Sequence, residues 1–350
     1  MTGFPLGKAK RCLFRMVAFL CQVLMWLGLF AGSLWAFGAL WFDFPLDSQR
    51  AWVAVGFGIT VILVGGFMRS HWWAKPGIAM AIVGVMLWWF TLQPRQYRDW
   101  VPELALLPYA TQVGEEVTLH NVRHLDYRTE EDFTPHYERR LLDLRNLRGM
   151  DLFICYWGSR YMAHPILSFD FGCDGRICFS IETRRERGES YSALGGLFRQ
   201  FELTCIVADE RDVIRVRTNY RKGEEVYLYP LKAPFMRESF LEYLQTVNEL
   251  HESPRWYHAI TDNCTSAIRH QRAASARTPW DWRLLVNGFV DELLYERGSI
   301  DRSVQFEELK RRSLINARAM EANGASDFSE RIREGFQTKA LSSEGAAKKP

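Results

Sequence analysis

The chain has 350 residues, which is room for about two domain-sized units, and 48% of them are hydrophobic. Its net charge of +3 is too small to indicate nucleic-acid binding, and no basic stripe with interleaved aromatic residues appears. Seven cysteines without a C-x-x-C pair argue against a disulfide scaffold and against a zinc site. We therefore expect no nucleic-acid partner, no metal and no cofactor.

Three apolar runs dominate residues 1–93, which we predict to be a membrane domain with three transmembrane helices at about 16–41, 52–68 and 78–92. The first run carries no charge and is long enough to cross a bilayer. It is also longer than the apolar region of a cleaved signal peptide, which is the competing interpretation. The second and third runs are near the lower limit for spanning.

Charges in the loops predict the orientation of these helices. Basic residues lie before the first run and between the second and third, whereas the 43–50 loop has Asp43 and Asp47 against Arg50 alone. The positive-inside rule then places the N-terminus in the cytoplasm and everything after about Gln93 outside. If the third run did not span, the later domain would be cytoplasmic instead.

Residues 94–300 read as one soluble domain with a β-hairpin near its middle. Residues 163–171 and 177–184 are strand-like and flank Asp174-Gly175, which is a turn signal. If the polar faces of the two arms coincide, one side of the hairpin gathers His164, Ser168, Ser180, Glu182 and Arg184. Cys173 and Cys178 flank the turn, so an oxidising compartment would allow a local disulfide there.

The rest of the chain mixes strand and helix patterns. Residues 117–122, 152–157, 213–217 and 225–231 are further strand candidates, whereas 235–250 has the period of a helix. Residues 301–338 are expected to form a C-terminal helical extension with one long helix at 304–322, and 339–350 a disordered tail. The fold class predicted is α+β, with an antiparallel sheet packed against helices.

Cys264 stands where a turn is expected to become a helix. Asp262 and Asn263 are strong N-cap residues, and neither Gly nor Pro interrupts 265–276, so Cys264 should lie in the first helical turn. Backbone N–H groups and the helix dipole stabilise a thiolate at such a position. The competing interpretation is a small buried residue without a chemical role.

A cysteine nucleophile needs a base within hydrogen-bond reach. His164 on the polar face of its strand is the preferred base, and His258, six residues before Cys264, is the alternative. Glu182 is favoured over Asp170 or Ser168 as the group that orients the imidazole. The Cys264 N–H and the Asn263 side chain are the candidate oxyanion donors. Arg184 and Arg217 are candidates for gripping a phosphate or carboxylate, although arginines more often form structural salt bridges.

Several ordered motifs resemble those of the Lnb N-terminal periplasmic domain family. They are Asn121-Val122-Arg123, Ala163-His164-Pro165, Ser180-Ile181-Glu182-Thr183-Arg184, Ala208-Asp209-Glu210-Arg211-Asp212, Arg217-Thr218-Asn219-Tyr220-Arg221, Val226-Tyr227-Leu228-Tyr229, and Trp256-Tyr257 with Asn263-Cys264-Thr265. The resemblance spans about 95–300 and implies a membrane-attached, periplasm-facing domain similar to the permuted papain-like fold of the NlpC and lecithin:retinol acyltransferase group. It implies His164 as base and Cys264 as nucleophile. The sequence departs from the family pattern at His258 and Ser266.

The hypothesis that follows is a multi-pass protein of a bacterial inner membrane whose periplasmic domain acts as a thiol acyltransferase or hydrolase. Its partners would be the lipid bilayer and a lipid or lipoprotein substrate. A cell-wall peptidase or amidase on the same fold is the second enzymatic interpretation. A non-catalytic membrane scaffold, in which Cys264 is structural, is the third. The sequence names neither the acyl donor nor the acceptor, and it gives no oligomeric state.

Overall fold

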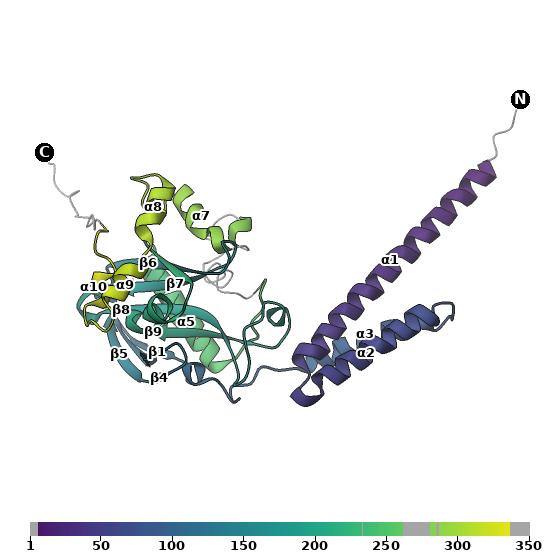
Figure 1. The fold of residues 1–350 in the computed structure, drawn as a ribbon, viewed down its shortest axis with the longest axis horizontal. Coiled ribbons are helices and arrows are strands. Elements are labelled where there is room, and N and C mark those ends of the chain that lie inside the picture. The colour runs from purple at the N-terminus through teal and green to yellow at the C-terminus, as the bar shows by residue number, and fades with distance from the viewer. Residues whose placement is uncertain (1–5, 233, 262–280, 285–286, 337–350) are drawn as a thin grey trace, which may run out of the picture. The chain divides into compact units, whose positions relative to one another are not determined.

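The computed structural model describes residues 6–232, 234–261, 281–284 and 287–336 (Figure 1). Its residues form two compact units. The first, here called the membrane unit, contains the chain up to Tyr97 together with Ser190–Glu202 and Trp256–Ala259. The second, here called the sheet unit, contains the other described residues. Each unit is described by itself below.

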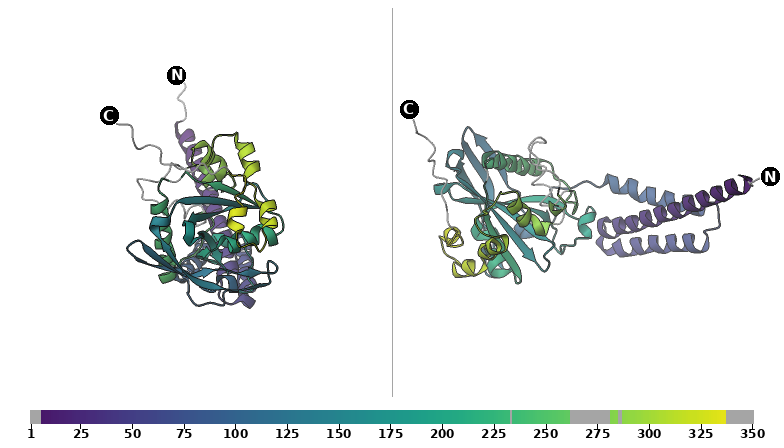
Figure 2. Two further views of the ribbon diagram at one scale, coloured as in Figure 1. Left: turned by 90° about the vertical axis from the view of Figure 1, so that its left-hand side faces the viewer. Right: turned by 90° about the horizontal axis from the view of Figure 1, so that it is seen from above.

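The membrane unit is built on α1 (Leu6–Asp43), α2 (Asp47–Phe67) and α3 (Ala74–Thr91), which lie side by side (Figure 2). Within the described residues, three segments are long and apolar enough to cross a membrane: Leu13–Asp43, Ser48–Phe67 and Ala74–Thr91. The last of them has 18 residues, which at the helical rise is roughly 27 Å, close to the thickness of a bilayer core. The third apolar run is therefore long enough to span.

The sheet unit holds an eight-stranded sheet in the described part of the chain, with order β1-β2-β9-β8-β7-β6-β10 and β5 paired to β2. The strands are β1 (Tyr109–Val113), β2 (Glu116–Arg123), β5 (Tyr137–Asp143), β6 (Gly149–Trp157), β7 (Ala163–Asp170), β8 (Arg176–Arg184), β9 (Glu202–Ala208) and β10 (Glu224–Pro230). A separate pair joins β3 (Asp126–Tyr127) to β4 (Phe133–Thr134). Antiparallel pairing dominates, with a parallel contact between β2 and β9. This confirms the α+β class.

The predicted hairpin is present as β7 and β8. Leu167 pairs with Phe179 and Ser168 with Cys178, so the apolar faces of the two arms coincide, and so do the polar faces. Gly175 has φ +90°, a conformation that favours glycine and lets the chain reverse after the short helical turn η3 (Gly172–Asp174). Cys173 is exposed and Cys178 is buried, and the two are free thiols in this structure.

One face of the hairpin packs against α5 (Met236–Glu252), the helix expected at 235–250. The Phe240 ring lies edge-on to the rings of Phe169, Phe171 and Phe179, at centroid distances of 5.2, 4.9 and 5.7 Å. All four rings are at most 1% exposed. Offset and edge-to-face aromatic pairs stabilise a core beyond the area that they bury, so this cluster anchors α5 to the sheet.

The opposite face carries the polar side of the hairpin and is also covered. Its apolar cluster joins Phe153, Cys155 and Ile166 of the sheet to side chains of α4 (Glu210–Val213), α9 (Asn316–Glu321) and α10 (Phe328–Arg331). The other described helices are α7 (Val290–Glu296), α8 (Phe306–Ser313), the π-helical turn η5 (Val216–Tyr220) and the 3-10 turns η1 (Pro102–Leu104), η2 (Leu144–Asn146), η4 (Gly195–Leu197), η7 (Trp282–Leu284) and η8 (Asn287–Phe289). The C-terminal extension is therefore part of this core.

Two sequence expectations in this region are wrong. Residues 213–217 are helical rather than a strand, because the Asp209 side chain caps the N-terminus of α4 by accepting from the Arg211 N–H at 2.9 Å. The single helix expected at 304–322 is broken between α8 and α9, where the Ile315 N–H donates to the Val226 carbonyl at 2.9 Å. That contact lies beside a β-bridge between Leu314 and Tyr227, so pairing with β10 outweighs helix continuation.

Candidate functional site

His164 lies near the start of β7, opposite Cys155 of β6. The Asn287 side chain accepts from the backbone N–H of the preceding Ala163 at 2.9 Å, which fixes this end of the strand. His164 is 9% exposed, so its ring is largely removed from water and its hydrogen-bond partners determine its chemistry.

Ser180 of β8 stands between the imidazole of His164 and the carboxylate of Glu182. His164 Nε2 lies 2.7 Å from Ser180 Oγ, and Ser180 Oγ donates to Glu182 Oε1 at 2.8 Å. The direct distance from His164 Nε2 to Glu182 Oε1 is 3.6 Å, too long for a hydrogen bond. The carboxylate therefore reaches the imidazole through the serine hydroxyl.

Glu182 is in turn held by Arg217, which comes from the π-helical turn η5. Arg217 donates to Glu182 Oε1 at 3.0 Å and to Glu224 Oε2 of β10 at 3.4 Å, and it is 6% exposed. Burial raises the pKa of Glu182, but the His164 imidazole and the Arg217 guanidinium outweigh it and hold that pKa well below its usual range. Glu182 is thus an ionised carboxylate at neutral pH.

This charge state determines which nitrogen of His164 is basic. An ionised carboxylate only accepts hydrogen bonds, so the single hydroxyl proton of Ser180 is directed to Glu182. Ser180 Oγ must then accept the proton carried by His164 Nε2. In the neutral ring the lone pair is on Nδ1, so Nδ1 is the nitrogen through which His164 would take a proton.

The other residues considered for orienting the imidazole have different partners. Ser168 donates to Glu210 at 2.6 Å, and Asp170 accepts from Arg176 at 2.7 Å. Of the three side chains weighed from the sequence, Glu182 is the one that the hydrogen bonds link to His164. The bridging role of Ser180 was missed, because alternation placed it on the polar face without indicating its partners.

Arg184, predicted to bind substrate, is 3% exposed and packed into the sheet unit. Its guanidinium donates to the carbonyls of Leu104 and Ala105 at 3.0 and 2.9 Å and stacks over Trp100 at 4.2 Å. Those contacts are typical of an arginine that fastens a loop to a sheet. Arg217 is likewise engaged with two half-buried carboxylates, so neither guanidinium is presented on the surface.

The predicted nucleophile Cys264 and the predicted oxyanion donor Asn263 lie outside the described residues. His258, the alternative base, is half-buried within the Trp256–Ala259 segment of the membrane unit. The assignments of these residues stay predictions. Among the described residues, no group of three or more His, Cys, Asp or Glu side chains is arranged to hold a metal ion.

The buried cysteines of the sheet unit are unsuited to nucleophilic attack. Burial raises the pKa of Cys155 to about 12, although Arg217 lies near enough to oppose the rise. Burial also raises the pKa of Cys178 and of Cys205. The thiolate is the reactive form of cysteine, so these three thiols are inert packing groups at neutral pH.

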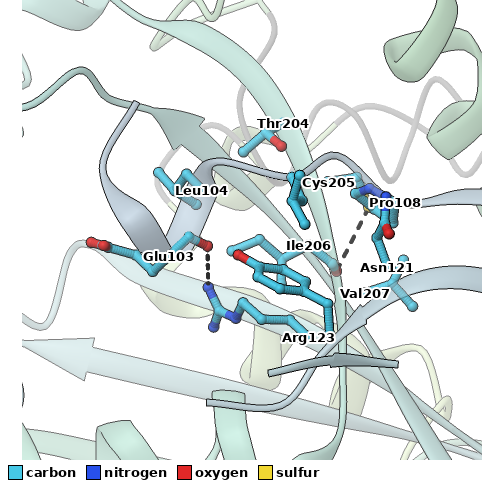
Figure 3. A pocket seen from close by; sticks show the side chains of 11 residues that line it. Glu103, Leu104, Pro108, Asn121, Arg123, Thr204, Cys205, Ile206 and Val207 are labelled. Atoms are coloured by element: carbon cyan, nitrogen blue, oxygen red, sulfur yellow. Dashed lines mark hydrogen bonds between the residues drawn. The ribbon is translucent and has the colours of Figure 1, made fainter. Parts of the chain in front are cut away.

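A small cavity between η1, β2 and β9 lies beside the Asn121-Val122-Arg123 motif (Figure 3). Asn121 sits at a β-bulge with φ +57° and donates to the Leu107 carbonyl at 2.9 Å. Arg123 donates to the Glu103 carbonyl at 3.2 Å (Figure 3). It also pairs with the buried Asp212 at 2.8 Å. The cavity volume is about 10 Å³, room for a single water molecule, so it is not a site for an acyl substrate.

Residues 133–288 match the model of a family described as the Lnb N-terminal periplasmic domain. This is the family that the ordered motifs resemble, so the match confirms that recognition. The matched segment includes His164, Glu182, Arg217 and Cys264, whereas Asn121 precedes it. The chain matches no curated protein and no solved structure.

Proposed function

We propose that this chain is a membrane-anchored periplasmic protein that acts as a cysteine acyltransferase or hydrolase. Two findings support the proposal: residues 133–288 match the model of the Lnb N-terminal periplasmic domain, and three apolar helices precede them. In this proposal Cys264 is the nucleophile, His164 the base and Glu182 the group that orients the base through Ser180. The protein crosses the bacterial inner membrane several times, and its substrate is an acyl group of a lipid or lipoprotein. The fold around the dyad is a permuted papain-like domain.

The chemistry proceeds through a thioester. His164 Nδ1 takes the proton of the Cys264 thiol, and the thiolate attacks an ester, thioester or amide carbonyl. The tetrahedral intermediate collapses with release of the alcohol, thiol or amine, which takes the proton back from the imidazolium. An amine or water then attacks the thioester and passes its proton to His164. The acyl group leaves with the attacking molecule, and the Cys264 thiolate takes the proton from the imidazolium to restore the free thiol.

The hydrogen-bond chain from His164 through Ser180 and Glu182 to Arg217 carries this proposal. A structural histidine needs only one partner for each nitrogen. Here the hydrogen bonds lead to a half-buried carboxylate kept ionised by arginine, an arrangement that holds one tautomer and stabilises the imidazolium formed during acyl transfer. The N-cap residues before Cys264 supply independent support from the sequence.

The test is covalent labelling of detergent-purified protein with a thiol-directed lipid probe, followed by peptide mapping. We expect Cys264 to be labelled in preference to the exposed Cys21 and Cys173, and we expect His164→Ala to slow that labelling by about a hundredfold, in line with the usual contribution of a general base. Cys264→Ala should abolish it, with His120→Ala as a histidine control outside the proposed dyad.

Each contrary result rejects the proposal. Equal labelling of Cys264 and Cys173 would indicate an unactivated thiol and would favour the scaffold interpretation. A Cys264 labelled fast by a soluble peptide-like electrophile, but not by the lipid probe, would favour the cell-wall peptidase or amidase. Preferential loss of labelling in His258→Ala would transfer the role of base to that residue.

A further inference from the structure

A hollow of about 550 Å³ opens within the membrane unit, between α1 and the loop that joins α2 to α3. Gln22 and Trp26 of α1 line it on one side, and Arg69–Trp72 of the loop and Lys75 of α3 line it on the other. All of these residues are described and lie in the same compact unit. A volume of this size is typical of a site for a small molecule. We call it the basic hollow.

The basic hollow holds two permanent positive charges, on Arg69 and Lys75. Neither side chain forms an ion pair with a residue that the structure describes, and the Lys75 ammonium lies over the Trp26 ring at 5.4 Å. Residues 1–42 and 51–98 contain no Asp or Glu, and Asp43 and Asp47 lie at the opposite ends of α1 and α2 from the hollow. A cation close to hydrocarbon is costly without a counter-charge, so this charge is complementary to an anion from outside the chain.

The start of α3 adds to this preference for an anion. Lys75 is its second residue, and its first turn contains no acidic side chain and no capping side chain among the described residues. The backbone N–H groups and the dipole at such a helix start favour a negative charge. Gln22 and Ser70 add neutral hydrogen-bond donors to the lining. Two cations with several N–H and O–H donors are the groups that bind phosphate oxygens.

The lengths of α2 and α3 indicate that the anion belongs to a lipid. Their apolar spans have 20 and 18 residues, which is roughly 30 and 27 Å and close to the thickness of a bilayer core. The loop between them then lies at the depth of the lipid headgroups. Phe67 and Trp72 are 81% and 88% exposed on the two sides of Arg69 in the sequence. Exposed aromatic rings beside bases suit that depth.

The helix α1 continues past the loop and forms a wall of the hollow (Figure 2). Roughly 24 Å of α1 precede Gln22. By the helical period, Arg11 and Arg15 lie on the same face of α1 as Gln22 and Trp26. Further bases therefore follow the face of α1 that lines the hollow, and they extend its positive charge.

We infer that the basic hollow binds the headgroup of an anionic phospholipid, with Arg69 and Lys75 holding the phosphate oxygens. Phospholipids with an ammonium headgroup fit less well, because their second charge would meet the same two cations. In the predicted topology the lipid belongs to the cytoplasmic leaflet. Its binding would join the α2–α3 loop to α1. The inference uses residues of the membrane unit alone and is independent of the function proposed above.

Native mass spectrometry of the full-length protein tests the preference. The protein is released from detergent micelles that contain equal amounts of phosphatidylglycerol and phosphatidylethanolamine. We expect the wild type to retain phosphatidylglycerol in excess by about fivefold or more. Arg69→Gln and Lys75→Gln should each reduce that retention about fivefold, the usual contribution of one base near an anionic lipid surface, whereas Lys75→Arg should keep it.

Lys10→Gln is the matched control for the loss of one base. Lys10 is exposed at the same end of α1, but it lies about 120° around the helix from Gln22. Its substitution should therefore change the retention less than about twofold. Arg69→Gln, at an exposed position in the loop, decides the test by itself if Lys75→Gln fails to fold.

Thermal unfolding in detergent identifies the source of the phosphate. Added phosphatidylglycerol should raise the Tm of the wild type, because a ligand that binds the folded state stabilises it, and it should not raise the Tm of the Arg69→Gln, Lys75→Gln double variant. Inorganic phosphate at the same concentration should leave both Tm values unchanged.

Three results would overturn the inference. Equal retention of the two lipids by the wild type would show that the hollow does not select an anionic headgroup. Equal losses in Lys10→Gln and Lys75→Gln would show that the general charge of this end of the helices, rather than a site, attracts the lipid. An equal rise in Tm with inorganic phosphate and with phosphatidylglycerol would assign the hollow to a soluble anion.

Discussion

The Ser180 hydroxyl determines which nitrogen of the His164 imidazole is basic. It has a single hydroxyl proton, and the ionised Glu182 beside it can only accept. The His164 imidazole must therefore donate through Nε2, which makes Nδ1 basic. The neighbouring strand residue Cys155 has the opposite fate, because burial keeps its thiol protonated. Hydrogen-bond partners, rather than depth of burial alone, distinguish a candidate catalytic group from a packing group here.

Glu182→Gln is expected to destabilise the protein by about 3 kcal/mol at pH 7, since it removes a carboxylate from a buried arginine. The native pKa of Glu182 lies below the unfolded value of about 4.3, so its contribution is fully present above that pH and is lost as pH falls through the native pKa. The stability gap between wild type and Glu182→Gln should thus be constant from about pH 7 to pH 5 and narrow below about pH 4.

Chemical denaturation in detergent at a series of pH values measures that gap. Glu131→Gln is the control, because Glu131 is exposed. A gap that stayed constant down to about pH 3 would contradict the ionised, arginine-held carboxylate.

At the scale of elements, helices cover both faces of the sheet. The β7–β8 hairpin therefore lies in the middle layer of the fold. The apolar face is closed by α5, and the polar face is closed by α4, α9 and α10. Arg333, just after α10, ties that second layer down by donating to Glu210 at 2.8 Å and to Asp151 at 2.7 Å. The polar side of β7 and β8 is therefore interior, which explains why its serines and carboxylates are paired.

Phe240→Ala is expected to lower the free energy of unfolding by about 3–5 kcal/mol, because the ring is fully buried among three other aromatic rings. Phe235→Ala, at a phenylalanine that is 61% exposed near the start of the same helix, should cost less than about 1 kcal/mol. Thermal unfolding of the purified variants compares them. Equal losses for the two substitutions would show that α5 is not held by the aromatic cluster.

At the scale of the whole molecule, the chain joins three apolar helices to a later domain that matches a periplasmic family. The apolar helices indicate membrane attachment, and the family match supports a periplasmic location for the later domain. The number of times that the chain crosses the membrane determines whether a membrane-attached domain can also be periplasmic. In the proposed topology, three crossings with the N-terminus in the cytoplasm place the domain outside, which agrees with the periplasmic description of the matched family.

Reporter fusions test that topology directly. Alkaline phosphatase fused after Arg98 should be active, and the same enzyme fused after Ser70 should be inactive, because it folds only outside the cytoplasm where disulfides form. A fluorescent protein fused after Ser70 should give the complementary signal. An inactive fusion after Arg98 would mean that α3 does not cross, and the proposed periplasmic setting of His164 would fail.

Local patterns in the sequence determined much of this protein. Three charge-free runs predicted the apolar helices, the Asp174-Gly175 turn predicted the β7–β8 hairpin, and strand alternation placed His164, Ser180 and Glu182 on one face. The ordered motifs were sufficient to recognise the family, and the match over residues 133–288 confirms that recognition. These features depend on residues close together in the chain, where period, turn chemistry and charge act directly.

Only the tertiary structure decided how those parts are used. Alternation could not reveal that Ser180 bridges His164 to Glu182, or that Arg184 is occupied by the Leu104 and Ala105 carbonyls. It predicted a strand at 213–217, where the Asp209 cap produces a helix, and it gave no sign that Phe198 packs beside Gly38. The Asp209 cap is a local contact that the strand pattern of 213–217 obscured. The other outcomes are contacts whose partners become neighbours only on folding, so no local pattern encodes them.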